Sequence, residues 1–231
     1  MVAAGYDRIA ERYSRWAERI EGDPCDLIVA AFAARLPAGA RVLDLGCGPG
    51  IPSTRALAER FEVTGIDISE KQIELARANV PGATLVHGDF TEVDLPDGSF
   101  DGVAAFYSIS HAPREGHARL FARIARWLVP GGLFVASLGV ADSPDWVGEW
   151  LGAEMFFSSF DADTNRALLR AAGFDLLLDE IVEMREPEGP ASFLWVTARK
   201  SATRRAASAP DLPRSAKLAR TKQSSRGPSA A

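Results

Sequence analysis

Two hydrophobic periods alternate along the chain. Short apolar runs that fit buried strands occupy residues 41–45, 62–67, 84–87, 100–107 and 133–138. The stretches between them repeat apolar residues every three or four positions, as amphipathic helices do, at residues 52–60, 70–79 and 113–129. Strands that alternate with helices in this way predict an α/β fold with a mostly parallel sheet and helices on both faces.

The pattern continues differently at the two ends of this block. A helical repeat at residues 7–21 and a second helix start at Asp23–Pro24, an N-cap followed by a first-turn proline, predict two helices before the first strand. After the fifth strand we expect a helix and two strand-like runs, at residues 164–172, 174–184 and 191–199.

The densest signal is V-L-D-L-G-C-G-P-G at residues 42–50, where an apolar strand runs into three alternate glycines and then a helix. Glycines let the backbone turn sharply, and we expect the N–H groups of this turn to contact a ligand that a Cβ would obstruct. Dinucleotide dehydrogenases show G-x-G-x-x-G, whereas this chain shows D-x-G-x-G-x-G. Asp44, two residues before Gly46, suits a ligand that carries an ammonium group.

On this glycine motif and the signals that follow it, the chain resembles the class I S-adenosylmethionine-dependent methyltransferases over roughly residues 6–200. The resemblance implies a Rossmann-like sheet of seven strands, one of them antiparallel, with an N-terminal helical cap. It also implies S-adenosyl-L-methionine as the cofactor. The turn residues that would bind it are Asp44, Gly46, Cys47 and Gly48.

Ligands of open α/β sheets lie beyond the carboxyl ends of the strands, where four candidates stand: Gly46, Asp67, Asp89 and Phe106. Ser69 and Gln72 form a capping-box pattern, so the helix at 70–79 begins just after Asp67. We expect Asp67 to accept hydrogen bonds from both ribose hydroxyls of the cofactor. The alternative is a turn carboxylate at the positive end of the next helix.

Ile68 would then lie against one face of the adenine. The resemblance makes Asp89 the acceptor for the adenine amino group and directs the backbone N–H of Phe90 to a ring nitrogen. Alternatively, Gly88–Asp89 only forms a turn.

The first helix carries two tyrosines, Tyr6 and Tyr13. They resemble those of the Y-D-x-x-A-x-x-Y start of many small-molecule methyltransferases, where this helix closes over the cofactor. Tyr13 is the stronger candidate for a cofactor contact. Their spacing suits ordinary core packing equally well.

Methyl transfer is an in-line displacement, so the enzyme supplies alignment, a dry pocket and sometimes a base. The segment from Phe106 to His111 stands where the family places residues beside the transferring methyl. His111, which titrates near neutrality, is the general-base candidate, Tyr107 would position the acceptor, and Phe106 would contact the cofactor. The alternative for His111 is a hydrogen bond to backbone only. The chain lacks the D/N-P-P-Y/F motif of DNA amino-methyltransferases here, which disfavours nucleobase methylation.

Aromatic residues crowd residues 146–160, where the family inserts acceptor-binding elements. They indicate an apolar or aromatic small-molecule acceptor, with Glu154 as a reserve acid or base. The alternative is a helix that packs its Trp and Phe residues on the sheet edge.

Charge and composition narrow the class. The net charge is −5, but from Lys200 onward there are eight basic residues and one acid, so the preceding body is strongly acidic and nucleic acid is an unlikely partner. Two cysteines, no apolar run long enough to span a bilayer and scattered histidines favour a cytoplasmic protein without membrane span or metal. We expect a methyltransferase domain at residues 1–200 and a disordered basic tail at 201–231.

Two other functions stay open. One is a nicotinamide-dependent reductase, because its glycine turn is related. The other is a methyltransferase-like binding module that has lost catalysis. The acceptor, the atom methylated and the oligomeric state are not determined by the sequence.

Overall fold

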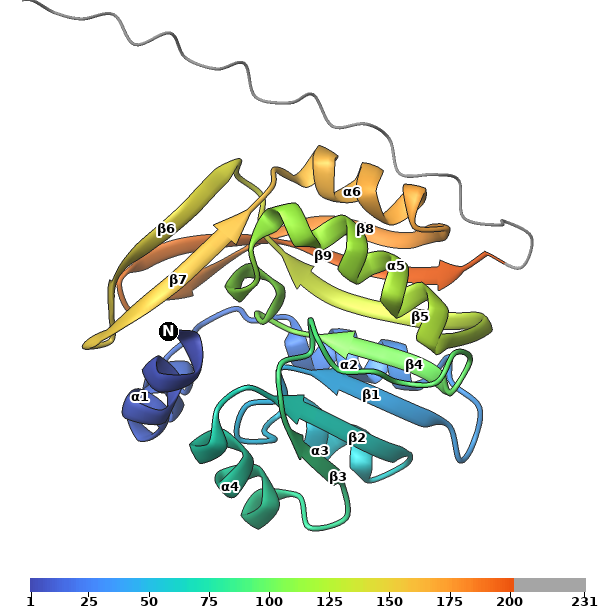
Figure 1. Ribbon diagram of the computed structural model, residues 1–231, viewed down its shortest axis with the longest axis horizontal. Helices are drawn as coiled ribbons and strands as arrows, with labels where there is room; N and C mark the ends of the chain where they lie inside the picture. Colours follow the sequence, from blue (N-terminus) through green and yellow to red (C-terminus); the bar gives the residue numbers. More distant parts are fainter. Residues whose placement is uncertain (202–231) are drawn as a thin grey trace, which may run out of the picture.

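The apolar runs pair into one sheet of seven strands, in the order β3-β2-β1-β4-β5-β9-β8 (Figure 1). The computed structural model describes residues 1–201, and the predicted tail falls outside them apart from its first residue. The strands are β1 (Arg41–Leu45), β2 (Glu62–Asp67), β3 (Thr84–His87), β4 (Phe100–Ala105), β5 (Leu128–Leu138), β8 (Phe174–Glu186) and β9 (Gly189–Lys200).

Strand direction follows from the connections. Helical crossovers make β1 to β5 parallel, whereas β9 follows β8 through a short turn and runs antiparallel to both β8 and β5. The expected seven-stranded, mostly parallel sheet with one antiparallel strand is therefore confirmed.

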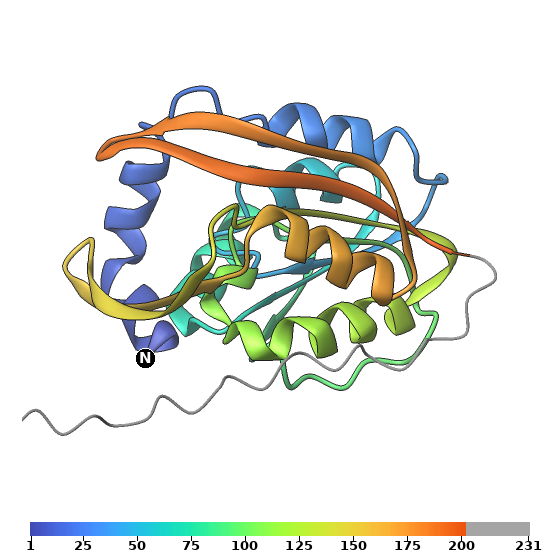
Figure 2. The same cartoon turned by 90° about the horizontal axis from the view of Figure 1, so that it is seen from above.

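Helices cover both faces of the sheet. The α-helices are α1 (Val2–Ala17), α2 (Cys25–Ala33), α3 (Ser53–Ala58), α4 (Glu70–Asn79), α5 (His117–Trp127) and α6 (Ala162–Ala171). Helix α2 lies on one side of the sheet, and α5 and α6 lie on the other (Figure 2). Successive residues of β1 point to opposite faces, so Val42 belongs to the core cluster that includes α2 and α3, and Leu43 to the cluster that includes α5 and α6. Among residues 1–201, no helix is both long and apolar enough to cross a membrane.

Three predicted boundaries were wrong. The first helix begins at Val2 and ends at Ala17, because Glu21 leaves it to exchange two backbone hydrogen bonds with Arg185 of β8. Strand β4 stops at Ala105, two residues short of the prediction. The predicted helix at 113–129 is a 3-10 turn followed by the shorter α5, and the Pro-Gly-Gly expected to stop it belongs to β5.

The aromatic segment forms a hairpin rather than a helix. Strands β6 (Ser143–Trp150) and β7 (Ala153–Ser159) pair antiparallel around Leu151 and Gly152, whose φ angles of 50° and 82° fit a tight hairpin turn. Ala153 and Met155 of β7 pack on Ile9 of α1. Helix α1 and this hairpin lie together beyond the carboxyl ends of β1 and β4 (Figure 1).

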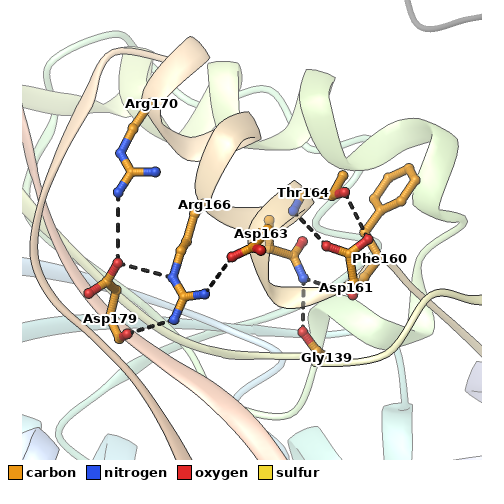
Figure 3. Close-up of polar contacts among 9 residues, drawn as sticks. Gly139, Phe160, Asp161, Asp163, Thr164, Arg166, Arg170 and Asp179 are labelled. Carbon is orange, nitrogen blue, oxygen red and sulfur yellow. Dashed lines mark hydrogen bonds and ion pairs between the residues drawn. The ribbon is translucent and has the colours of Figure 1, made fainter.

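Helix α6 contacts Asp179 of β8 through two arginines, Arg166 and Arg170, and the Arg166 bonds are the shorter ones. The Arg166 guanidinium donates to the Asp179 carboxylate at 3.0 Å, to the Asp179 carbonyl at 2.9 Å and to Asp163 at 2.9 Å (Figure 3). Asp161 begins α6 by accepting the Thr164 N–H at 2.8 Å. The wall formed by β8 and β9 is thus held against the rest of the fold.

Candidate active site

The glycine turn directs its N–H groups into the protein. Gly46 and Cys47 both donate to the carbonyl of Ile66, at 2.8 and 3.0 Å, and the Gly48 N–H donates to Asp67 Oδ2 at 2.8 Å. The expectation that these N–H groups contact the ligand is therefore corrected, because β2 lies alongside the turn and accepts their hydrogen bonds.

What the turn presents instead is surface without side chains. Gly48 has φ +53°, and a Cβ added there would meet no atom within 4 Å. At Gly46, with φ +74°, a Cβ would lie 2.3 Å from Ser108 Cβ, so this glycine is required for packing. Gly48 is the position at which a ligand can rest against bare backbone.

A narrow space of about 60 Å³, the glycine cleft, opens over this turn. The predicted site residues that line it are Tyr13, Gly46, Gly48, Asp67, Ile68, Phe90, Phe106, Tyr107 and His111. At one end it meets the Asp89 cavity, about 320 Å³, lined also by Ile68 and Phe90. At the other it meets the Asp23 cavity, about 300 Å³, lined also by Cys47 and Gly48.

Asp67 is anchored by backbone at the mouth of the glycine cleft. Its Oδ1 accepts the Ser69 N–H at 2.9 Å and its Oδ2 accepts the Gly48 N–H. Burial raises the pKa of the Asp67 carboxyl, and these two bonds oppose the rise. Each carboxylate oxygen can accept a further hydrogen bond, so the side chain is still able to bind a hydroxyl.

Asp44 lies beneath the turn instead of at the cleft. It is 1% exposed, and its Oδ2 accepts hydrogen bonds from the hydroxyls of Thr54 at 2.7 Å and Ser53 at 3.3 Å. Burial raises the pKa of Asp44 to about 6. Both bonds end on Oδ2, and Asp44 is absent from the lining of the glycine cleft and of the two cavities that adjoin it.

Asp89 is both a turn residue and a cavity residue. Its Oδ1 accepts the Thr91 N–H and hydroxyl, at 2.8 and 2.7 Å, while the residue lines the Asp89 cavity with Phe90. His87 nearby bonds the Ile68 carbonyl at 3.0 Å through Nε2. Across residues 1–201, His, Cys, Asp and Glu form no group of three or more arranged to hold a metal ion.

Gln72 is a cleft residue that the sequence identified only as part of a cap. Its N–H donates to Ser69 Oγ at 3.1 Å, which confirms one half of the predicted capping box. Its side chain does not return the bond. Both amide atoms are buried in the wall of the glycine cleft and have no partner within the described residues. Gln72 is therefore a candidate for a ligand contact.

Asp23 and Arg55 were also missed as site residues. Both line the Asp23 cavity. Asp23 Oδ1 accepts the Tyr107 hydroxyl at 2.7 Å and the Cys25 N–H at 2.9 Å. The sequence identified Asp23 as the start of α2, and that local role concealed its second position beside the glycine turn. A carboxylate and a guanidinium in one cavity complement a zwitterionic group.

His111 has a fixed tautomer. A carbonyl only accepts hydrogen bonds, so the 2.9 Å contact with Phe156 places the proton on Nδ1. Nε2 therefore carries the lone pair and accepts the Tyr6 hydroxyl at 2.8 Å. Burial lowers the pKa of His111 to about 4. The expectation that it titrates near neutrality is corrected: it is a neutral base with an occupied lone pair.

Tyr107 separates two spaces. Its φ is +57°, unusual for a residue with a side chain, and its N–H donates to Ser137 Oγ at 2.7 Å. The hydroxyl donates to Asp23, so both the backbone and the far end of the side chain of this residue are held by hydrogen bonds. The side chain faces the glycine cleft on one side and a further cavity on the other.

That further space, the aromatic cavity, has a volume of about 320 Å³. It shares four residues with the glycine cleft: Tyr6, Tyr13, Tyr107 and His111. Its remaining walls include rings from several elements, namely Trp16 of α1, Trp150 of β6, Phe157 of β7 and Phe193 of β9. Cleft and cavity therefore meet at a partition of three tyrosines and one histidine.

Comparisons with known proteins agree with this geometry. The profile of a methyltransferase domain family matches residues 42–132. A 27-O-demethylrifamycin SV methyltransferase from Amycolatopsis mediterranei (strain S699) is 36% identical over 152 residues, 57% of this chain and 55% of that protein. An O-methyltransferase from Penicillium expansum is 38% identical over 171 residues, 69% of this chain and 60% of that protein. The chain thus spans little more than half the length of these relatives.

A solved structure extends the match to the fold. The S-adenosylmethionine-dependent methyltransferase from Mesorhizobium loti superimposes with a TM-score of 0.58 at 26% identity, covering 74% of this chain and 96% of that one. The family profile begins at β1 and includes the whole glycine turn. Sequence, turn and strand order agree, and the chain belongs to the class I S-adenosylmethionine-dependent methyltransferases.

Proposed function

We propose that this protein transfers a methyl group from S-adenosyl-L-methionine to an O, N or C atom of a small-molecule acceptor. The observation that carries the proposal is the partition at Tyr6, Tyr13, Tyr107 and His111, where the glycine cleft meets the aromatic cavity. Relatives named for methyl transfer to a rifamycin and to trans-aconitate support a small acceptor.

The residues present fit the cofactor. The bare backbone at Gly48 leaves room that a Cβ would fill, and the buried Gln72 amide has no partner within the described residues. We infer that Asp67 and Gln72 bind the ribose. Adenine would lie by Ile68, Asp89 and Phe90.

The Asp23 cavity would take the amino-acid end of the cofactor. Asp23 suits its ammonium and Arg55 its carboxylate, while Cys47 and Tyr13 complete the walls. In this assignment Asp44 acts indirectly, by bonding the Ser53 and Thr54 hydroxyls at the start of α3. When bound, the cofactor supplies an electrophilic methyl group on a sulfonium.

Carboxylates around the partition favour positive charge. Burial raises the pKa of Tyr13, and Asp67, Asp23 and Glu186 raise it further through their negative charge. The same field that opposes a tyrosinate stabilises a cation in this place. The aromatic rings exclude water from it.

His111 is the proton acceptor of this proposal. Its Nε2 lone pair faces the partition, and an acceptor hydroxyl or amine would replace the Tyr6 hydroxyl there. The Phe156 carbonyl keeps the other ring nitrogen protonated, so only Nε2 can take the proton. Tyr107 would position the acceptor against the cleft, where Phe106 would contact the cofactor.

Calorimetry tests the cofactor. S-adenosylhomocysteine and NADPH are titrated in parallel, and we expect heat from the first alone; binding of NADPH alone would overturn the proposal in favour of a reductase. A screen of phenols, amines and carboxylates for S-adenosylhomocysteine release then tests catalysis. Tight cofactor binding without release by any of them would indicate a binding module.

Two further assignments remain proposals. We infer one methyltransferase domain at residues 1–200, because the lining of the cleft draws on residues from both α1 and the central sheet. We also infer a cytoplasmic location, because Cys25 and Cys47 are free thiols in the structure.

A further inference from the structure

The aromatic cavity extends along the buried side of α1. Tyr6 and Trp16 both line it, and ten helical residues correspond to about 15 Å along the axis. His111 contacts the Tyr6 end, whereas Trp16 is bonded to Glu188 of the β8–β9 turn, next to Glu186. The cavity therefore has a reacting end at His111 and a remote end at Glu186.

The walls carry one full charge. Burial keeps His111 neutral at neutral pH, and the tyrosines are protonated there, which leaves Glu186 as the ionised side chain of the lining. None of the described residues that line this cavity is Lys or Arg. An anionic acceptor would thus meet a carboxylate and no cation.

Glu186 is half-buried and free. Within residues 1–201 no hydrogen bond or ion pair reaches its carboxylate, whereas the neighbouring Glu188 accepts the Trp16 indole N–H at 2.8 Å. Burial raises the pKa of Glu186, and the charge of Glu188 raises it further. A carboxylate partly removed from water without a partner is costly, and a ligand cation would compensate that cost.

Resting on the proposed function, we propose that the acceptor is an elongated, planar, mostly apolar molecule with a protonated amine at the end opposite its reacting atom, and that Glu186 binds this amine. Trp16 lines the same cavity as Glu186, and an aromatic ring near an ammonium group is a favourable contact for a cation. The atom to be methylated then lies at the partition, near His111.

Three rod-shaped phenols of nearly equal size test the charge preference: tyramine, 4-ethylphenol and 4-hydroxyphenylacetate. Each is titrated with and without saturating S-adenosylhomocysteine, and binding is followed by fluorescence because Trp16 and Trp150 line the cavity. We expect tyramine to bind roughly five- to tenfold more tightly than 4-ethylphenol, and 4-hydroxyphenylacetate to bind most weakly.

Glu186→Gln should remove the preference for tyramine while leaving 4-ethylphenol binding within about twofold. Glu183→Gln, the same change at an exposed position of β8, should leave the order intact. A preference that survives in Glu186→Gln, equal binding of all three probes, or binding of none would overturn the inference. Failure of the proposed function would appear separately, as absence of S-adenosylhomocysteine binding, and the titrations without it still measure the charge order.

Discussion

At the carboxyl ends of β1 and β2, the glycine cleft presents the bare main chain of Gly48 and one carboxylate, that of Asp67, which bonds backbone. Asp67 bonds Ser69, two residues away, and Gly48, nineteen residues away. Across the partition, the aromatic cavity is formed mostly by side chains, from α1, β6, β7, β8 and β9 and from the segment that follows β4. Its key contact, Tyr6 to His111, spans 105 residues.

This difference fits what each space is proposed to bind, the cofactor in the glycine cleft and the acceptor in the aromatic cavity. A cofactor common to a family can be bound by backbone geometry that few substitutions disturb. An acceptor differs between family members, and side chains brought together by tertiary packing can change without altering the sheet. The comparison predicts that damage to the cleft abolishes cofactor binding, whereas damage to the cavity changes turnover or acceptor choice.

A side chain added at Gly48 should have the largest effect on cofactor binding. We expect Gly48→Leu to weaken S-adenosylhomocysteine binding about a thousandfold, because its side chain enters a space of about 60 Å³. Gly39→Leu is the matched control, since Gly39 also has a positive φ and open space around it but lies before β1. Calorimetry measures binding and thermal unfolding measures the shared backbone strain. Equal binding losses in both variants would contradict the role of the cleft.

Removing the His111 side chain should lower turnover and leave cofactor binding nearly unchanged. We expect His111→Ala to lower kcat about a hundredfold with an acceptor found by screening, and to leave cofactor affinity within about twofold. Because the pKa of His111 is lowered to about 4, wild-type activity should stay level from pH 8 down to about pH 5 and fall only below it.

Tyr6→Phe sharpens that result. It removes the hydroxyl that occupies His111 Nε2 and keeps the ring, so kcat should change less than about threefold if the acceptor takes this position. A loss as large as that of His111→Ala would instead make Tyr6 part of the proton path. An unaltered kcat in His111→Ala would show that His111 is not the general base.

Removing the charge of Asp67 should weaken cofactor binding less than adding a side chain at Gly48. Asp67→Asn should weaken S-adenosylhomocysteine binding by about 1.5 kcal/mol, roughly tenfold, the scale of a charge-assisted hydrogen bond. Asp101→Asn provides the control, because Asp101 also accepts a backbone N–H, that of Arg41, but at the amino ends of the strands, away from the cleft. Unchanged affinity in Asp67→Asn would remove this residue from the site.

The sequence was most informative where structure depends on neighbours along the chain. The order of strands and helices, the glycine turn and the Ser69 cap are local signals, and the structure contains them. The hairpin of β6 and β7 was not predicted because its apolar residues do not alternate as they do in a half-buried strand. Trp146 and Val147 are adjacent and are both exposed. The turn at Leu151–Gly152 carries no strong turn signal in its first residue.

Contacts between distant segments were beyond prediction. His111 was found as a candidate, but its neutral state depends on burial and on Phe156, 45 residues away. Glu186 falls between the two predicted strand-like runs at residues 174–184 and 191–199, and nothing local places it in a cavity with Trp16 of α1. The Gln72 amide is the intermediate case, since its helix position was predicted and its missing partner was not.

The smallest expected effect on cofactor binding is that of Asp44, whose charge should instead affect the pH dependence of stability. In the folded state the pKa of Asp44 is raised to about 6, so between about pH 4 and pH 6 the folded protein holds a proton that the unfolded chain has lost. The contribution of Asp44 to the free energy of unfolding therefore falls as pH rises through this window. Asp44→Asn lacks that loss, and its stability relative to wild type should increase by about 2 kcal/mol between pH 4.5 and pH 7.5.

Thermal unfolding of both proteins at matched pH measures this difference, and the subtraction removes the opposite trend of His111, whose lowered pKa makes stability rise with pH over about the same range. S-adenosylhomocysteine affinity of Asp44→Asn should remain within about twofold of wild type, because the side chain bonds Thr54 beneath the turn. A tenfold loss, equal to that of Asp67→Asn, would mean that Asp44 reaches the ligand, and the boundary of the cleft would then have to include the layer below the glycines.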